Sequence, residues 1–150
     1  MDAGEAGFLE LLKKIEEEGL TQEIQLFLTV LLPPKLVSGS IKLLYHDASI
    51  KCYIAKKSRR LFWTIMSKKN KYLIFSDTNT KFCSCLSYAN NAVKKGQYPF
   101  CKHILTIYFC EALQKKGDIS QFSKEEIDDD SFSELIASNV FYIAFRAKKS

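Results

Sequence analysis

The stretch Phe82-Cys83-Ser84-Cys85, followed fifteen residues later by Cys101-Lys102-His103, decides the fold of this chain. It brings three thiols and one imidazole together in two close pairs. Thiolate sulfur and imidazole nitrogen suit Zn²⁺, and four such ligands close a tetrahedral site. A single free cysteine can equally be a small buried hydrophobe, so it is the pairing that favours a metal. The sequence therefore predicts one structural zinc ion bound by Cys83, Cys85, Cys101 and His103.

The spacing of two residues within each pair also constrains the backbone. Side chains two residues apart point to opposite faces of a strand and lie about 200° apart on a helix, so neither regular element lets such a pair reach one ion. Strand-like sequence at 61–75 precedes the first pair, and a helical pattern at 104–113 follows the second. We expect the ion to join the end of a sheet to the N-terminus of a helix, where the helix dipole favours thiolate.

Helical sequence flanks a central run of short strands. Apolar residues recur at helical spacing in 8–15 and 24–32, with Gly19 ending the first helix, Thr21 capping the second and Pro33-Pro34 ending it. Beyond Ser38-Gly39-Ser40, strands are predicted at 41–45, 50–56, 61–66 and 72–75, with turns between them that include Asp47-Ala48. We expect an α+β fold: a small antiparallel β-sheet followed by zinc-stapled helices, with helical N- and C-terminal segments.

The second half of the chain is less regular. A short helical stripe is predicted at 86–95, and the helix after His103 is apolar around most of its circumference, so the N-terminal helices or a partner chain must cover it. Residues 121–130 read as an acidic linker with two capping-box candidates, Ser123 with Glu126 and Ser131 with Glu134. The segment 132–145 has the length of a helix, although 140–143 alone could be a strand, and it either packs in the core or binds a partner.

Length and composition indicate one soluble, intracellular domain. The 150 residues divide into N-terminal helices (1–37), a zinc module (38–116) and a C-terminal linker with a packing or partner-binding segment (117–150). The apolar runs are much shorter than the roughly 20 residues of a membrane span. Five cysteines suit a reducing compartment, with Cys52 and Cys110 as core residues, although Cys110 is an alternative thiol ligand.

The net charge of +5 is unevenly distributed along the chain. Residues 35–117 contain 16 Lys or Arg residues and three acidic residues. The two ends together contain 6 Lys or Arg residues and 14 acidic residues. Basic residues interleaved with aromatics are typical of single-stranded nucleic-acid sites, although strand aromatics such as Trp63 and Phe75 usually pack in a core and clustered basic turns also occur on ordinary surfaces. The candidate nucleic-acid-binding residues are Lys56, Lys57, Arg59, Arg60, Lys68, Lys69 and Lys71.

The Cys83-x-Cys85 and Cys101-x-His103 pairs resemble the SWIM zinc-finger family, whose signature is CxC, a variable gap and CxH. The likeness covers about residues 38–115, including Ser58-Arg59-Arg60 and Lys71-Tyr72-Leu73, and is greatest to the small SWIM-domain subunit of Shu homologous-recombination complexes. It implies a nuclear subunit that forms a heterodimer with a RecA-like recombinase paralogue. Such a subunit promotes recombinase filament assembly on single-stranded DNA during DNA repair.

No catalytic constellation is recognisable in the sequence. Gly39, Gly96 and Gly117 are isolated and do not form a phosphate-binding loop, and a four-ligand zinc site has no position for substrate or activated water. We therefore expect a protein that is not an enzyme. The alternative to the Shu-type adaptor is a stand-alone SWIM-type protein that binds DNA or RNA by itself.

Overall fold

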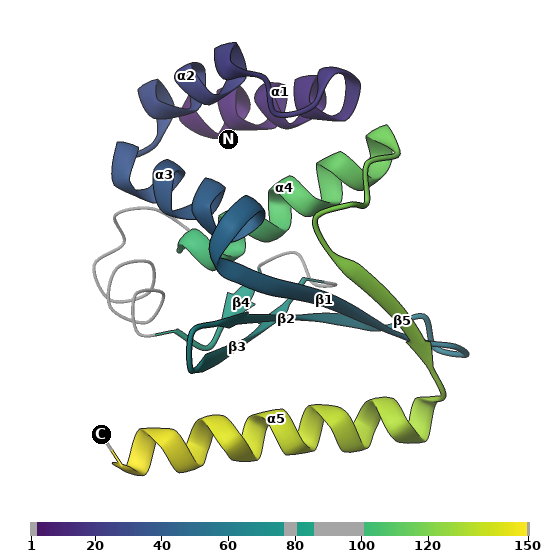
Figure 1. Cartoon of the computed structure of the whole chain (residues 1–150). Coiled ribbons are helices and arrows are strands. Elements are labelled where there is room, and N and C mark those ends of the chain that lie inside the picture. Colours follow the sequence, from purple (N-terminus) through teal and green to yellow (C-terminus); the bar gives the residue numbers. More distant parts are fainter. Residues whose placement is uncertain (1–2, 77–80, 86–100, 150) are drawn as a thin grey trace.

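A five-stranded sheet lies between helices on both of its faces in the computed structural model, which describes residues 3–76, 81–85 and 101–149 (Figure 1). On one face lies α4 (Lys102–Lys116), with α3 (Pro34–Lys42) beside it and α1 (Ala3–Glu18) and α2 (Gln22–Leu31) beyond them. On the other face lies α5 (Asp129–Lys149). The predicted α+β class is confirmed. Among the described helices, none combines the length and the apolar character that crossing a bilayer demands.

The sheet has the strand order β4-β3-β2-β1-β5. Its strands are β1 (Ala48–Ala55), β2 (Leu61–Ser67), β3 (Asn70–Phe75), β4 (Phe82–Cys83) and β5 (Ser123–Ile127). Neighbouring strands are antiparallel except β1 and β5, which are parallel. The strands predicted at 50–56, 61–66 and 72–75 are confirmed. Burial alternates along β1, as expected for a pleated strand, whereas β2 has a continuous buried run.

The first two helices begin and end as the sequence predicts. Thr21 caps α2, its Oγ1 accepting a hydrogen bond from the Ile24 N–H at 3.2 Å. Gly19 has a φ of 84°, the left-handed conformation that commonly follows a helix. Gly117, at a φ of 99°, ends α4 in the same way.

The prediction of a strand at 41–45 is wrong. Pro34 begins a helix, α3, instead of merely ending the preceding one, and the chain continues through a π-helical segment, η1 (Leu43–Asp47), directly into β1. Proline is well suited to the first turn of a helix, since its missing N–H has no intrahelical partner there. Ser38-Gly39-Ser40 does not mark the start of the strands but lies inside α3. The buried residues of this helix and of η1 are Leu36, Val37, Ser40, Leu43 and Leu44.

The acidic linker predicted at 121–130 is also wrong. Its central residues form β5, which hydrogen-bonds to the free edge of β1 although its side chains are mostly exposed. Ser123 and Glu126 therefore lie in a strand, and α5 is capped by Asp128, whose carboxylate accepts bonds from the Ser131 N–H at 2.8 Å and Oγ at 3.0 Å. The helical interpretation of the last segment is confirmed by α5.

Two hydrophobic cores lie on the two faces of the sheet. The larger one joins the sheet to α4, α1, α2 and α3, and it contains both Cys52 and Cys110, as predicted. The smaller one joins the sheet to α5 through Ala55, Phe62, Leu73 and Phe132. The N-terminal helices thus cover α4, one of the two expected alternatives. The helical stripe predicted at 86–95 lies outside the described residues.

Candidate metal centre

The four predicted ligands converge where β4 meets α4. Cys83 ends β4 and Cys85 follows two residues later, while Cys101 is the N-cap of α4 and His103 lies in its first turn. All four side chains are buried, and one ligand atom from each lies within 4.8 Å of the others. The predicted placement of both pairs at element ends is confirmed, and the cluster is a potential metal site that joins sheet to helix.

The spacing of the ligand atoms fits a tetrahedral ion. A zinc–sulfur bond of about 2.3 Å and a zinc–nitrogen bond of about 2.05 Å at the tetrahedral angle separate the sulfur from the nitrogen by about 3.6 Å. Cys101 Sγ and His103 Nδ1 are 3.8 Å apart. Nδ1 of His103 therefore lies at a ligand-to-ligand distance from Cys101 Sγ, and the four buried ligand atoms are close enough together to hold one divalent cation.

Hydrogen bonds among the thiols and burial set the proton balance of the cluster. The described cysteines are free thiols, so no disulfide competes for these sulfurs. Thiol hydrogen bonds from Cys101 and Cys83 lower the pKa of Cys85, whereas hydrogen bonds with Cys101 and Cys85, together with burial, raise the pKa of Cys83. A hydrogen bond with Cys83 lowers the pKa of Cys101, but one with Cys85 and burial outweigh it and raise that pKa to about 12. Without a cation the cluster therefore shares protons, which a divalent ion would displace.

Ser84 holds the first ligand pair against the sheet. Its Oγ accepts a hydrogen bond from the Leu73 N–H at 3.0 Å, and its own N–H donates to the Leu73 carbonyl at 3.1 Å. This role of Ser84 was not predicted from the sequence. The available signal was a short hydroxyl side chain in a turn, which commonly bonds to nearby backbone groups.

The second ligand pair is held by α3. The carbonyl of Lys102, between Cys101 and His103, accepts a hydrogen bond from Thr106 Oγ1 at 2.7 Å and lies 2.9 Å from Ser40 Oγ. Ser40 and Thr106 are both fully buried. The ring of Tyr72 from β3 packs on the His103 ring with centroids 4.1 Å apart. Helix α3 and the sheet therefore orient the imidazole together.

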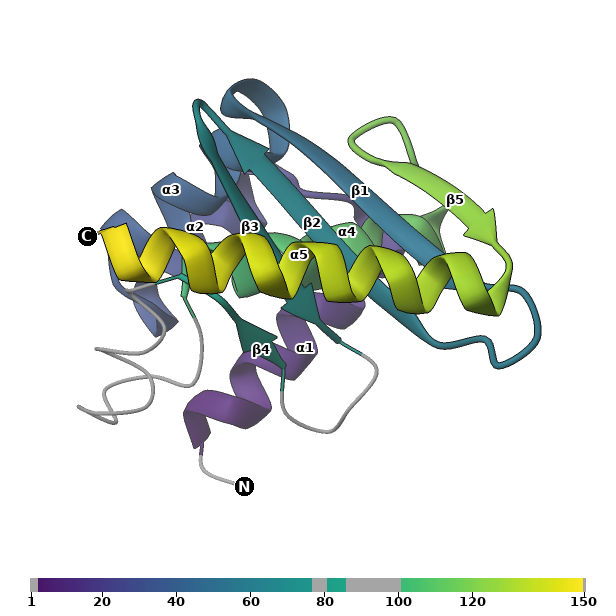
Figure 2. The same ribbon diagram turned by 90° about the horizontal axis from the view of Figure 1, so that it is seen from below.

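The candidate nucleic-acid-binding residues do not form one site. Four lie in the β1–β2 turn and three in or beside the β2–β3 turn, at opposite ends of the sheet (Figure 2). The seven residues of β2 separate the two groups by roughly 20 Å. In the first group Arg59 forms an ion pair with Glu126, and the Asp129 carboxylate accepts bonds from the Lys57 and Ser58 N–H groups at 2.9 and 3.2 Å.

The aromatic side chains between these basic residues mostly serve packing. Trp63 is 2% exposed and Phe62 is fully buried, so neither can stack on a nucleobase. The packing predicted for Trp63 is confirmed, and its indole N–H donates to Ser76 Oγ at 3.0 Å. Phe75 and Tyr72 are half-buried.

Comparison with known proteins gives no further guidance. No family model, no curated protein and no solved structure matches the chain.

Proposed function

We propose that this chain is a non-enzymatic zinc-binding subunit of a Shu-type complex in the nucleus. In this proposal it pairs with a RecA-like recombinase paralogue and promotes recombinase filament assembly on single-stranded DNA in homologous-recombination repair. The observation that carries the proposal is the buried cluster of three cysteines and one histidine at the junction of β4 and α4. Its CxC and CxH spacing is the feature that the chain shares with SWIM zinc fingers.

Zinc is the metal that best suits this ligand set. Three thiolates and one imidazole match its preference for sulfur and nitrogen in tetrahedral geometry. Four protein ligands occupy all positions of such an ion, so no bound water is available for activation. The proposed role of the ion is to hold α4 on the sheet, and this supports a binding function over a catalytic one.

The exposed face of α2 supports a protein partner. Ile24 and Leu28 are buried beneath it, whereas Leu26, Phe27 and Val30 are 69, 52 and 78% exposed. Adjacent apolar side chains that remain exposed are typical of protein interaction sites. We assign this face to the recombinase paralogue, since the apolar surface of α4, the other candidate, is buried inside the protein.

Native mass spectrometry of the complex purified from cells tests the proposal. We expect one zinc per chain and one ATPase-type companion, and we expect Leu26→Glu with Val30→Glu to release the companion while zinc is retained. Ile119→Glu, at an exposed apolar residue outside α2, is the matched control. A zinc-loaded chain that purifies as a stable monomer without a companion would contradict the Shu-type assignment.

A stand-alone nucleic-acid-binding protein is the second candidate function. It is favoured by Lys42, Lys68 and Lys102 beside the metal cluster, which form no ion pair with any carboxylate whose side chain the structure describes. The isolated chain would then bind oligonucleotides strongly, with a salt dependence equivalent to several phosphate contacts. Binding that requires the companion favours the adaptor.

A further inference from the structure

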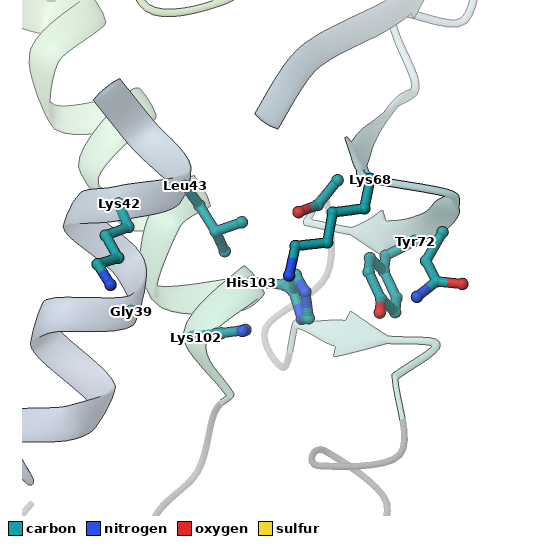
Figure 3. Close-up of a pocket in the computed structure, with 9 residues that line it drawn as sticks. Gly39, Lys42, Leu43, Lys68, Tyr72, Lys102 and His103 are labelled. Carbon is teal, nitrogen blue, oxygen red and sulfur yellow. The ribbon is translucent and has the colours of Figure 1, made fainter. Parts of the chain in front are cut away.

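A hollow of about 240 Å³ lies beside the metal cluster, between α3, the β2–β3 turn and the start of α4. Its walls include Gly39, Lys42, Lys68, Tyr72, Lys102 and His103 (Figure 3). The side chains of Lys68 and Lys102 reach into it from opposite sides, and Lys42 lies on α3 at its margin. Three separate elements therefore direct lysines towards one concave surface.

The backbone fixes where these lysines stand. Lys68 lies at the tip of the β2–β3 hairpin with a φ of 56°, and the Lys102 carbonyl is held by Ser40 and Thr106. Gly39 leaves room for the Lys102 side chain, because a Cβ at this position would lie only 3.1 Å from Lys102 Cδ. The hollow is thus built by the same contacts that orient the second ligand pair.

The positive charge of this surface has no carboxylate partner among the side chains that the structure describes, a set that does not include Asp47. Within that set, none of the ion pairs involves Lys42, Lys68 or Lys102. The positive end of the α4 dipole adds to the field of these lysines. An anion is the complementary ligand.

A second, more open hollow of about 510 Å³ extends this surface along α3. It shares Gly39, Lys42 and Lys102 with the first and adds Lys35. Lys35 and Lys42 are two helical turns apart on the same face of α3, about 10 Å along its axis. The two hollows together form a basic track, defined by Lys35, Lys42, Lys68 and Lys102.

We propose that the basic track binds the phosphodiester backbone of single-stranded nucleic acid. A concave, positively charged groove that follows the backbone is the usual means of holding a single strand. A duplex is instead read by an element that protrudes into one of its grooves. The first hollow is smaller than the roughly 300–1,000 Å³ of pockets that enclose drug-sized ligands, so it suits a phosphate rather than a whole nucleotide. The inference rests on the proposed function, whose DNA contact it assigns to particular residues.

The test compares two sets of charge-removing substitutions in the full zinc-loaded chain, with and without its companion. The first set is Lys42→Gln, Lys68→Asn and Lys102→Gln, where asparagine tolerates the left-handed conformation of residue 68. The matched set is Lys56→Gln, Lys57→Gln and Arg60→Gln at the other end of the sheet. Binding of a fluorescent oligothymidylate is measured by anisotropy over a series of salt concentrations.

Each lysine that contacts a phosphate contributes about 0.7 to the slope of log K against log salt, or about fivefold in affinity at 0.1 M salt. We therefore expect the first set to lose about two units of slope and about a hundredfold in affinity, and the matched set to change little. An equal loss in both sets, or no loss in the first, would overturn the inference.

Two further binding measurements distinguish nucleic acid from other anions. Inorganic phosphate should displace the oligonucleotide only weakly, because one phosphate fills the first hollow and not the whole basic track, and poly-glutamate should bind far more weakly than the oligonucleotide. Binding of poly-glutamate as tight as that of the oligonucleotide, or competition by inorganic phosphate as strong as that by unlabelled oligonucleotide at the same concentration of phosphate groups, would overturn the inference. Zinc content and companion recovery are measured on the same preparations. If the unsubstituted protein contains no zinc or recovers no companion, the proposed function is contradicted. If the first set of variants keeps its zinc and its companion but binds the oligonucleotide as well as the unsubstituted protein does, only the basic track is contradicted.

Discussion

Two groups of basic residues at opposite ends of the same sheet have different surroundings. The turn cluster, Lys56, Lys57, Arg59 and Arg60, lies against carboxylates: Glu126 pairs with Arg59, and Asp129 accepts bonds from the backbone of this turn. Lys42, Lys68 and Lys102, which belong to the basic track, form no ion pair with any carboxylate whose side chain the structure describes, a set that leaves out Asp47. The first group therefore has two carboxylates beside it, one of them paired with Arg59, whereas the second has none among the side chains that the structure describes.

The difference arises from contacts that are distant in sequence. Glu126 lies 67 residues from Arg59, and Asp129 lies 72 residues from Lys57. Strand β5 and helix α5 bring these acids to the turn cluster, while the metal cluster and α3 bring lysines together at the other end. The number of basic residues in a segment thus predicts its charge, but not whether that charge is available to an anionic ligand.

Removal of the proposed zinc is the largest perturbation of this comparison. Structural zinc contributes on the order of 10 kcal/mol to the folding of small zinc domains. We expect Cys83→Ser or a strong chelator to unfold the junction of β4 and α4, to displace Lys102 and to abolish oligonucleotide binding. Circular dichroism melting and zinc content measure the effect. Cys52→Ala, at a buried cysteine outside the cluster, should keep its zinc, and a chelated protein with an unchanged melting curve would refute the structural role.

Loss of the Ser84 hydroxyl is expected to have the second-largest effect. Ser84→Ala leaves the Leu73 N–H without its acceptor, which costs about 1–3 kcal/mol for a buried donor. Because Ser84 holds the first ligand pair, we also expect roughly tenfold weaker zinc binding. Urea unfolding and a competitive zinc chelator provide the two measurements. Ser49→Ala, on an exposed part of β1, should change neither, and equal effects at both positions would contradict the role given to Ser84.

The contact between α3 and α4 tests how the basic track is assembled. Ser40→Ala removes one of two hydroxyls at the Lys102 carbonyl, and because Thr106 remains we expect a cost of about 1 kcal/mol. Oligonucleotide binding should weaken with it, since Lys42 and Lys102 lose a fixed relative position. Ser38→Ala, on the exposed side of the same helix, is the control. Unchanged urea unfolding in Ser40→Ala would show that this contact does not stabilise the helix pair.

The smallest expected effect is a loss of stability at acidic pH through Asp129, which accepts hydrogen bonds from the turn cluster. Backbone hydrogen bonds from Lys57 and the bonds from Ser58 hold the pKa of Asp129 below its usual range. Because the pKa of Asp129 is lower in the folded state, its ionised carboxylate stabilises the fold at every pH above the unfolded-state pKa of about 3.9. This stabilisation is lost as the pH falls through the lower, folded-state pKa. We expect the melting temperature to fall across this acidic range, and less so in Asp129→Asn. Asp130→Asn is the matched control, and equal slopes in both variants would contradict the assignment to Asp129.

The ligand set and most elements were predictable because their signals are local. The two-residue spacing of Cys83 with Cys85, and of Cys101 with His103, excludes regular backbone at each pair, and helical or alternating periodicity identifies α1, α2, α4 and three strands. The signals failed where a distant partner decides the conformation. Residues 123–127 have no apolar alternation, yet the unpaired backbone edge of β1 makes them a strand. Gly39 suggests a turn, yet the approach of Lys102 to α3 accounts for a glycine inside a helix.

The sequence by itself thus determined which four side chains can hold a metal and most, though not all, of the helical and extended segments, since ligand chemistry and periodicity depend only on near neighbours. Only the tertiary structure decided which lysines are neutralised, which apolar helix face remains exposed and which hydroxyls support the ligands. The physical reason is that ion pairing, burial and backbone hydrogen bonding between elements depend on distances in space, which residue order does not specify.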